Sequence, residues 1–209
     1  KGNILDPLEI IKEYGLDPLR YYLIKEVSFG NDGNISQERL EDCINSDLAN
    51  NYGNLCQRVT AFANKNCDGK IPLDIKFQKE DLLILNKFKD NLNIIRSEID
   101  NQNINFYIDY IVNSLFEANK YFNDQEPWKK KDDQIRLNTI VYTTLEIVRK
   151  ISFLLYPIIP ESSLKVLNIF EIDEKKLELS SISDNEYLIK GKKLNKIDIL
   201  FKKIEKKND

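Results

Sequence analysis

The 209-residue sequence contains no histidine and no methionine, and it has only three cysteines, six prolines and seven glycines. The absence of histidine excludes Ser–His and Cys–His catalysis and any imidazole metal ligand within these residues. Because a translated chain begins with Met, the first residue, Lys1, leads us to expect a processed or excised piece of a longer protein. Cys43, Cys56 and Cys67 follow neither a zinc nor a disulfide pattern, so we predict reduced, mostly buried thiols.

The charge is nearly balanced, with 31 Lys and Arg against 34 Asp and Glu and a net charge of −3. This balance excludes a strongly basic nucleic-acid coat, although it permits a local binding site. No apolar run approaches the ~20 residues that span a bilayer, and no charged-then-apolar leader begins the chain. We therefore expect a soluble, intracellular, cytoplasmic protein with no membrane partner.

The few prolines and glycines divide the chain into helical segments. Asp6-Pro7 and Asp17-Pro18 each predict an N-cap followed by a helix, and Gly15 predicts the end of the first helix. Residues 28–34 indicate a turn, and a long helix follows over 36–66 with a bend near residues 45–46. Further apolar periodicity predicts helices over 79–100, 105–122, 133–156 and 161–169.

These segments predict an all-α fold, an antiparallel helix bundle preceded by a short helical piece. After Phe170 the helical period weakens. We expect residues 171–209 to form a small tail that packs back on the bundle as a hairpin and frays from Lys202 onward.

One candidate site is a polar row within the long helix. Asn50, Asn54 and Arg58 follow at steps of four, which places their side chains along one helix face. Asn offers a donor and an acceptor, and Arg offers a planar fork of donors, so the row suits the edges of unstacked bases. In a chain with 23 Asn, the alternative is an ordinary solvated face.

Gly53 interrupts this helix at a cost of up to ~1 kcal/mol relative to alanine. The close approach of a neighbouring helix would explain it, as would the close approach of a ligand, and packing is the favoured interpretation.

The second candidate is Pro127-Trp128, which holds the single Trp of the chain in a polar junction followed by three lysines. Such a Trp can stack on a base while the lysines neutralise phosphates. The alternative is a Trp that caps the core. No isolated carboxylate pair and no phosphate-binding loop accompanies these residues, so no active site is predicted.

Several segments of the sequence resemble those of a known family. Residues 1–7 resemble the segment that follows the KMSKS signature of class I aminoacyl-tRNA synthetases, and residues 15–23 (GLDPLRYYL) resemble their G-x-D-x-x-R-Y segment. Residues 29–33 (FGNDG) are similar to a stretch typical of methionyl-tRNA synthetases. Gly191 and Leu200-Phe201 resemble the closing G…LF stretch of that family.

The resemblance implies roles for both candidate sites. Asn50, Asn54 and Arg58 would hydrogen-bond the bases of a CAU anticodon, Trp128 would stack on the first base, and Pro127 would shape the turn. Residues 1–35 would end a stem-contact region, residues 36–170 would form the α-helical anticodon-binding domain, and residues 171–209 would be the tail. The parent enzyme would ligate methionine to its tRNA with ATP and Mg²⁺.

The resemblance also implies what this chain does not do. The catalytic domain would lie upstream of Lys1, so the fragment would be inactive, with no cofactor or metal of its own and with that domain as a partner. A monomer is expected. Lys202-Lys203 stands where many relatives have Pro-Arg. The rival interpretations are another class I synthetase, for Cys, Leu, Ile or Val, and a helical protein-interaction scaffold.

Overall fold

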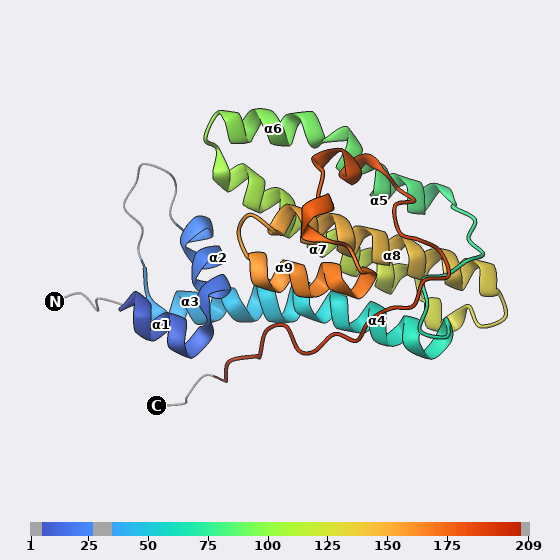
Figure 1. The fold of residues 1–209 in the computed structure, drawn as a ribbon, viewed down its shortest axis with the longest axis horizontal. Coiled ribbons are helices and arrows are strands. Elements are labelled where there is room, and N and C mark those ends of the chain that lie inside the picture. The colour runs from blue at the N-terminus through green and yellow to red at the C-terminus, as the bar shows by residue number, and fades with distance from the viewer. Residues whose placement is uncertain (1–5, 27–34, 206–209) are drawn as a thin grey trace.

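The computed structural model describes residues 6–26 and 35–205 (Figure 1). Within these residues every regular element is a helix and no strand is present, which confirms the predicted all-α class. The motifs predicted at residues 1–3 and 29–33 and the turn at 28–34 lie outside the described residues. Across the described helices, none is both long enough and apolar enough to cross a membrane.

The described chain begins with the two short helices α1 (Pro7–Tyr14) and α2 (Leu16–Glu26). Asp6 caps α1 as predicted, because its Oδ1 accepts a 2.8 Å hydrogen bond from the Leu8 amide. Gly15 ends α1 with a φ of 95°, in the region that favours glycine. The predicted start and end of the first helix are therefore confirmed.

The prediction that Asp17 caps the second helix is wrong. The helix α2 already begins at Leu16, and Asp17 is buried. Its Oδ2 instead accepts a 2.6 Å hydrogen bond from the Ser162 amide in the first turn of α9 (Pro160–Leu167). A carboxylate is favourable at that helix N-terminus, so Asp17 stabilises a helix that is distant in sequence.

The long helix predicted over residues 36–66 consists of three consecutive parts: α3 (Gln37–Cys43), a π-helical segment (Ile44–Gly53) and α4 (Asn54–Asn66). Ser36 caps it as predicted, since its Oγ accepts from the Arg39 amide at 3.3 Å. The π-helical segment stands where the bend was expected. A π-helical turn takes in about one residue more than an α-helical turn and is rare.

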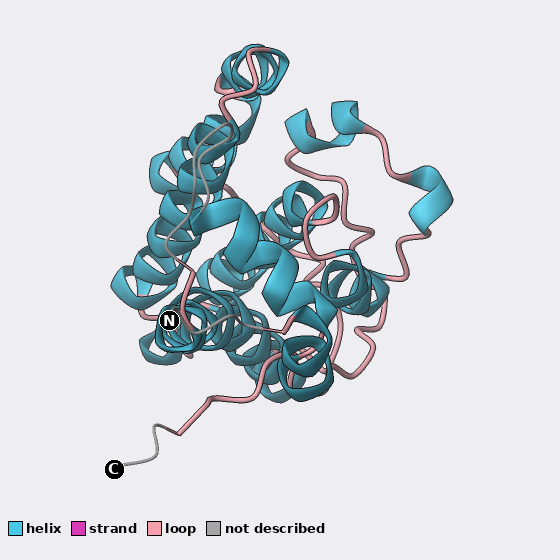
Figure 2. Cartoon of the chain, turned by 90° about the vertical axis from the view of Figure 1, so that its left-hand side faces the viewer, coloured by secondary structure: helices cyan, strands magenta, loops and turns pink. Residues whose placement is uncertain are grey.

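The bundle is completed by α5 (Lys79–Asp90), α6 (Leu92–Asp100), α7 (Ile104–Gln125), α8 (Gln134–Leu155) and α9. The helix α8 occupies its centre, where it contacts α4, α5, α7 and α9 (Figure 1). Figure 2 shows the same described residues as helices and loops, with no strand among them. Its side chains are buried on nearly all sides from Arg136 to Leu155, as expected for a helix surrounded by others.

The single helix predicted over 79–100 is wrong, because the chain breaks at Asn91 between α5 and α6. The Asn91 side chain donates a 2.8 Å hydrogen bond to the Lys87 carbonyl, so it competes with the helical backbone for that acceptor. The apolar period continues across the break, which is why the sequence pattern does not reveal it.

After α9 the chain forms three short 3₁₀ turns at Asn168–Phe170, Glu174–Lys176 and Leu179–Ser183. The tail then runs back along α4 (Figure 1), and an isolated antiparallel bridge between Lys70 and Lys193 pairs it with the segment that follows that helix. The predicted packing is confirmed, but the predicted hairpin is wrong. Fraying from Lys202 is also wrong for residues 202–205, because Ile204 is hydrogen-bonded to Asn45.

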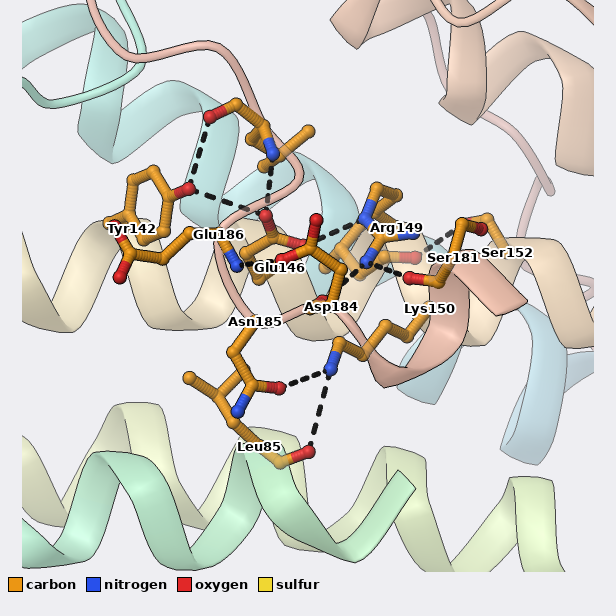
Figure 3. A network of polar contacts seen from close by, with 12 residues as sticks. Leu85, Tyr142, Glu146, Arg149, Lys150, Ser152, Ser181, Asp184, Asn185 and Glu186 are labelled. Atoms are coloured by element: carbon orange, nitrogen blue, oxygen red, sulfur yellow. Dashed lines mark hydrogen bonds and ion pairs between the residues drawn. The ribbon is translucent and has the colours of Figure 1, made fainter. Parts of the chain in front are cut away.

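A buried polar network on α8 holds residues 181–188 of the tail (Figure 3). Glu146 Oε2 accepts from Arg149 Nε at 2.7 Å, and Glu146 Oε1 accepts from the Leu188 amide at 2.6 Å. Arg149 also donates to the carbonyls of Ser181 and Asp184, both at 3.0 Å. These bonds replace secondary structure as the support of the irregular chain between residues 181 and 188.

Lys150 extends this network toward α5. Its Nζ donates to Asn185 Oδ1 at 2.5 Å and to the Leu85 carbonyl at 3.5 Å, and the side chain is fully buried. Burial, followed by repulsion from Arg149, lowers the pKa of Lys150 from its ordinary 10.5 to about 8, against the attraction of Glu146 and Asp184.

This pKa predicts a stability that rises with pH. The unfolded chain holds the Lys150 proton up to about pH 10.5, whereas the folded chain releases it near pH 8. We therefore expect the free energy of unfolding to rise by about 2 kcal/mol between pH 8 and pH 10, relative to Lys150→Met. Urea unfolding of the wild type and of Lys150→Met at each pH checks this. Subtracting one free energy of unfolding from the other cancels the contribution of tyrosine titration, which both proteins share. Parallel pH profiles would contradict it.

Candidate nucleic-acid interface

The polar row lies across the junction between the π-helical segment and α4. Asn50 belongs to the π-helical segment, whereas Asn54 and Arg58 belong to α4. Asn50 and Asn54 are exposed and Arg58 is half-buried. The two amides therefore keep their donors and acceptors accessible to solvent, as a surface that binds another molecule requires.

Arg58 is held by the neighbouring helix α7. Its Nη2 donates a 2.7 Å hydrogen bond to Asn123 Oδ1, and its guanidinium lies over the Phe122 ring at 5.5 Å from the centroid. Both contacts restrain a long, flexible side chain. The planar donor fork is thereby presented in a defined orientation at the edge of α7.

Trp128 lies in a short 3₁₀ turn, Pro127–Lys129, between α7 and α8. Glu126 ends α7 with a φ of 45°, a left-handed conformation that is uncommon for a residue other than glycine. Pro127 is buried, while Trp128 is 40% exposed. A Trp that only caps the core would be more fully covered, so the geometry favours the exposed-aromatic interpretation.

One ring joins the two candidate sites. Phe122 packs edge-on against Trp128, with ring centroids 6.2 Å apart, and the same ring lies beneath Arg58. The structure therefore brings Arg58 and Trp128 together from elements that are distant in sequence. Pro127 belongs to the turn that carries Trp128, and Asn50 and Asn54 are exposed on the helical stretch that leads to Arg58.

Phe122, Asn119 and Asn123 are the residues that the sequence analysis missed. Phe122 belongs to the apolar period of α7, so its sequence pattern indicates only core. Asn119 donates to Asn51 Oδ1 at 2.6 Å, beside the row. Its sequence position gives no sign of this role, because the contact joins two helices whose distance the sequence does not specify.

The charge around the site is moderate. Lys129 forms a 2.7 Å ion pair with Glu126 in the Trp128 turn, while Lys131 is exposed. Of the three lysines predicted to serve phosphates, Lys129 is thus already paired within the protein.

The three thiols of the chain are unreactive. All three cysteines are free, with Cys43 and Cys56 buried and Cys67 half-buried, as predicted. Burial raises the pKa of Cys67 to about 11 and that of Cys43 to about 12, and it raises the pKa of Cys56 as well. They therefore stay protonated near neutral pH and do not act as nucleophiles.

Comparisons with known proteins identify the family of this chain. The family described as "tRNA synthetases class I (M)" matches residues 1–60, and the family described as "Anticodon binding domain of methionyl tRNA ligase" matches residues 71–209. The fold and these matches define the class of protein as the helical C-terminal region of a class I aminoacyl-tRNA synthetase. More narrowly, the chain belongs to the family of methionyl-tRNA ligase anticodon-binding domains.

Individual relatives support the assignment. The chain is 39% identical over 87% of its length to a methionine–tRNA ligase of Brucella suis, and 35% identical over 99% of its length to one of Thermotoga maritima. It spans 35% and 33% of those proteins. The solved structure of apo Mycobacterium tuberculosis methionyl-tRNA synthetase superposes over 97% of this chain and 42% of that one, with a TM-score of 0.89 and 33% identity.

Proposed function

We propose that this chain recognises the CAU anticodon of methionine tRNA through the surface formed by Asn50, Asn54, Arg58 and Trp128. The observation that supports the proposal most strongly is the meeting of Arg58 and Trp128 at the ring of Phe122. In the proposed complex the two asparagines and Arg58 hydrogen-bond base edges, and Trp128 stacks on the first base of the anticodon. Pro127 shapes the turn that presents the indole.

The physical argument rests on unstacked bases. Sequence-specific RNA recognition targets loops whose bases are splayed out, stacked on aromatic rings and hydrogen-bonded at their edges. The surface supplies one accessible ring face, two free amides and one restrained guanidinium. A net charge of −3 makes binding by this chain alone weak, because few phosphates are neutralised.

The division of the chain and the activity of the longer protein are part of the proposal. Residues 1–35 would contact the tRNA stem, residues 36–170 would hold the anticodon, and residues 171–209 would support that domain. In a full-length monomeric, cytoplasmic ligase, a catalytic domain would attach methionine with ATP and Mg²⁺, and this chain alone would be inactive. The Mycobacterium tuberculosis enzyme has been solved in complex with methionyl-adenylate, which is consistent with this chemistry.

Fluorescence of the single Trp tests the proposal. At low salt, we expect a CAU anticodon stem-loop to quench Trp128, because stacking brings a base against the indole, and a loop of scrambled anticodon not to quench it. Arg58→Ala should weaken binding of the CAU loop by roughly 10-fold to 100-fold and Asn54→Ala by roughly 2-fold to 10-fold, since the lost bonds are charged and neutral respectively.

Asn93 and Arg96 provide matched controls, because they are the same residue types and are exposed on α6, away from the proposed surface. Asn93→Ala and Arg96→Ala should leave the affinity within about 2-fold. Equal quenching by both loops would remove the claim of anticodon specificity. Unchanged affinity in Arg58→Ala would favour a helical scaffold in which the polar row has no binding role.

A further inference from the structure

The tail makes two specific contacts with the π-helical segment. At one end of the segment Asn45 forms a paired contact with the backbone of Ile204: its Nδ2 donates to the Ile204 carbonyl at 2.9 Å, and its Oδ1 accepts from the Ile204 amide at 2.8 Å. At the other end Phe201 packs on Tyr52, with ring centroids 6.4 Å apart. The tail therefore spans the segment from its first residues to its last.

Gly53 lies beside the second contact. A Cβ at this position would lie 3.7 Å from the Phe201 ring, 3.9 Å from Leu200 Cβ and 3.0 Å from the Leu48 carbonyl oxygen. The two distances to the tail are those of ordinary packing, whereas the tight approach is to the Leu48 carbonyl oxygen. The glycine in the long helix is thus required by the backbone of the π-helical turn itself, and the tail packs over it.

Other contacts hold the segment on its remaining sides. Asp47 Oδ2 accepts from Lys25 Nζ at 2.5 Å and from the Tyr21 hydroxyl at 3.0 Å. Asn51 accepts from Asn119 of α7. The exposed residue Asn50 lies in the same segment, between residues bound by α7 and residues bound by the tail.

A π-helix of this length needs such support. Most π-helical turns occur singly, since the i→i+5 pattern is less favourable than the α-helical one. If one supporting side were lost, the segment would relax toward α-helix, which takes fewer residues per turn. Such a change would rotate Asn50 relative to Asn54 and Arg58, which lie in α4 and are held by the rest of the bundle.

We propose that Asn45 is a positioning residue for RNA recognition. By binding the tail at Ile204, it keeps residues 44–53 π-helical and so fixes the orientation of Asn50 relative to Asn54 and Arg58. Asn45 itself touches no RNA in this arrangement. The inference rests on the proposed function for its RNA-binding consequence, while the effect of the tail on the π-helical segment is independent of RNA.

Variants on the two sides of the contact test the inference in the full chain. Asn45→Ala removes both hydrogen bonds, and Ile204→Pro removes the amide that donates to Asn45. Each should weaken binding of the CAU stem-loop by about 5-fold or more. Because both substitutions remove the same contact, the double variant should bind as tightly as the single variant that binds less well. Hydrogen exchange of the amides of residues 44–53 should accelerate, while that of α8 should not.

A double-mutant cycle between Asn45 and Asn50 separates a positioning role from general destabilisation. Asn50→Ala should weaken binding in the wild type but have less than about 2-fold effect in Asn45→Ala, whereas Trp128→Ala should have the same effect in both. Asn195→Ala is the matched control. It removes a 2.9 Å bond to the Asn168 carbonyl elsewhere in the tail and should change the affinity by less than about 2-fold.

The possible results lead to different conclusions. If the wild type prefers the CAU loop and Asn45→Ala binds it equally well, the positioning role is wrong while the proposed function stands. Unchanged hydrogen exchange in residues 44–53 would also overturn it, whatever the RNA result. If the wild type shows no preference for the CAU loop, the proposed function fails first, and the RNA-positioning role fails with it.

Discussion

Replacing Glu146 with alanine is expected to lower the free energy of unfolding by about 3–5 kcal/mol, because it leaves Arg149 buried without a counter-charge. The Arg149 and Glu146 side chains are only 2% and 0% exposed, so water cannot replace the lost carboxylate. The Leu188 amide also loses its acceptor. Urea unfolding followed by circular dichroism measures the effect.

The exposed ion pair of Glu161 and Lys165 provides the control. Both residues lie on α9, with side chains 74% and 57% exposed, and Glu161→Ala should change stability by about 1 kcal/mol or less. Glu146→Gln keeps the size and one acceptor, so an intermediate loss is expected. A loss below about 1 kcal/mol in Glu146→Ala would show that the network is not a major support of residues 181–188.

The second large effect is expected at Asp81, which joins α5 to α7 and α8. Its two oxygens accept from Arg136 at 2.6 and 3.0 Å, and it also accepts from the Tyr121 hydroxyl. Asp81 is fully buried, so Asp81→Ala should lower the free energy of unfolding by about 3–5 kcal/mol. Thermal and urea unfolding of the variant check this result.

A double variant tests the physical reason. Replacing the pair together, as Asp81→Leu with Arg136→Met, leaves no buried charge and should be more stable than Asp81→Ala by at least about 1 kcal/mol. Arg136 also donates to Gln125 at 2.6 Å, close to the Trp128 turn, so the emission maximum of the single Trp should move in Asp81→Ala. A double variant less stable than Asp81→Ala would indicate a net contribution from the pair itself.

The helix ends and the apolar helix faces could be predicted because each is specified by residues that are close together in the sequence. Asp6, Gly15 and Ser36 mark helix ends through hydrogen bonds or φ values set within a few residues. The period of 3.6 residues indicates α7 and α8 from their apolar positions alone. The break at Asn91 was missed because its side chain competes for one carbonyl without interrupting that period. Asp17 was assigned to the wrong helix because its partner, Ser162, is far away in the sequence.

Some residues of the candidate site could be predicted from the sequence, and others could not. Spacing and residue type pointed to Asn50, Asn54 and Arg58, and an isolated Trp in a polar junction pointed to Pro127 and Trp128. Phe122, which connects Arg58 to Trp128, belongs to an apolar pattern that indicates core and nothing else. The contact of Asn45 with Ile204 likewise could not be predicted from the sequence. The two residues are far apart in the chain, and the local pattern around each of them does not identify its partner.

By itself, the sequence determined the all-helical class, most helix boundaries, the unreactive character of the cysteines and the residue types available for binding. The tertiary structure alone decided that Arg58 and Trp128 share one aromatic neighbour, that the tail lies on Gly53, and that residues 44–53 are π-helical. The physical reason is the range of the interactions. Caps and periodicity act within one or two turns, whereas these features depend on packing between segments whose separation and orientation only the folded chain defines.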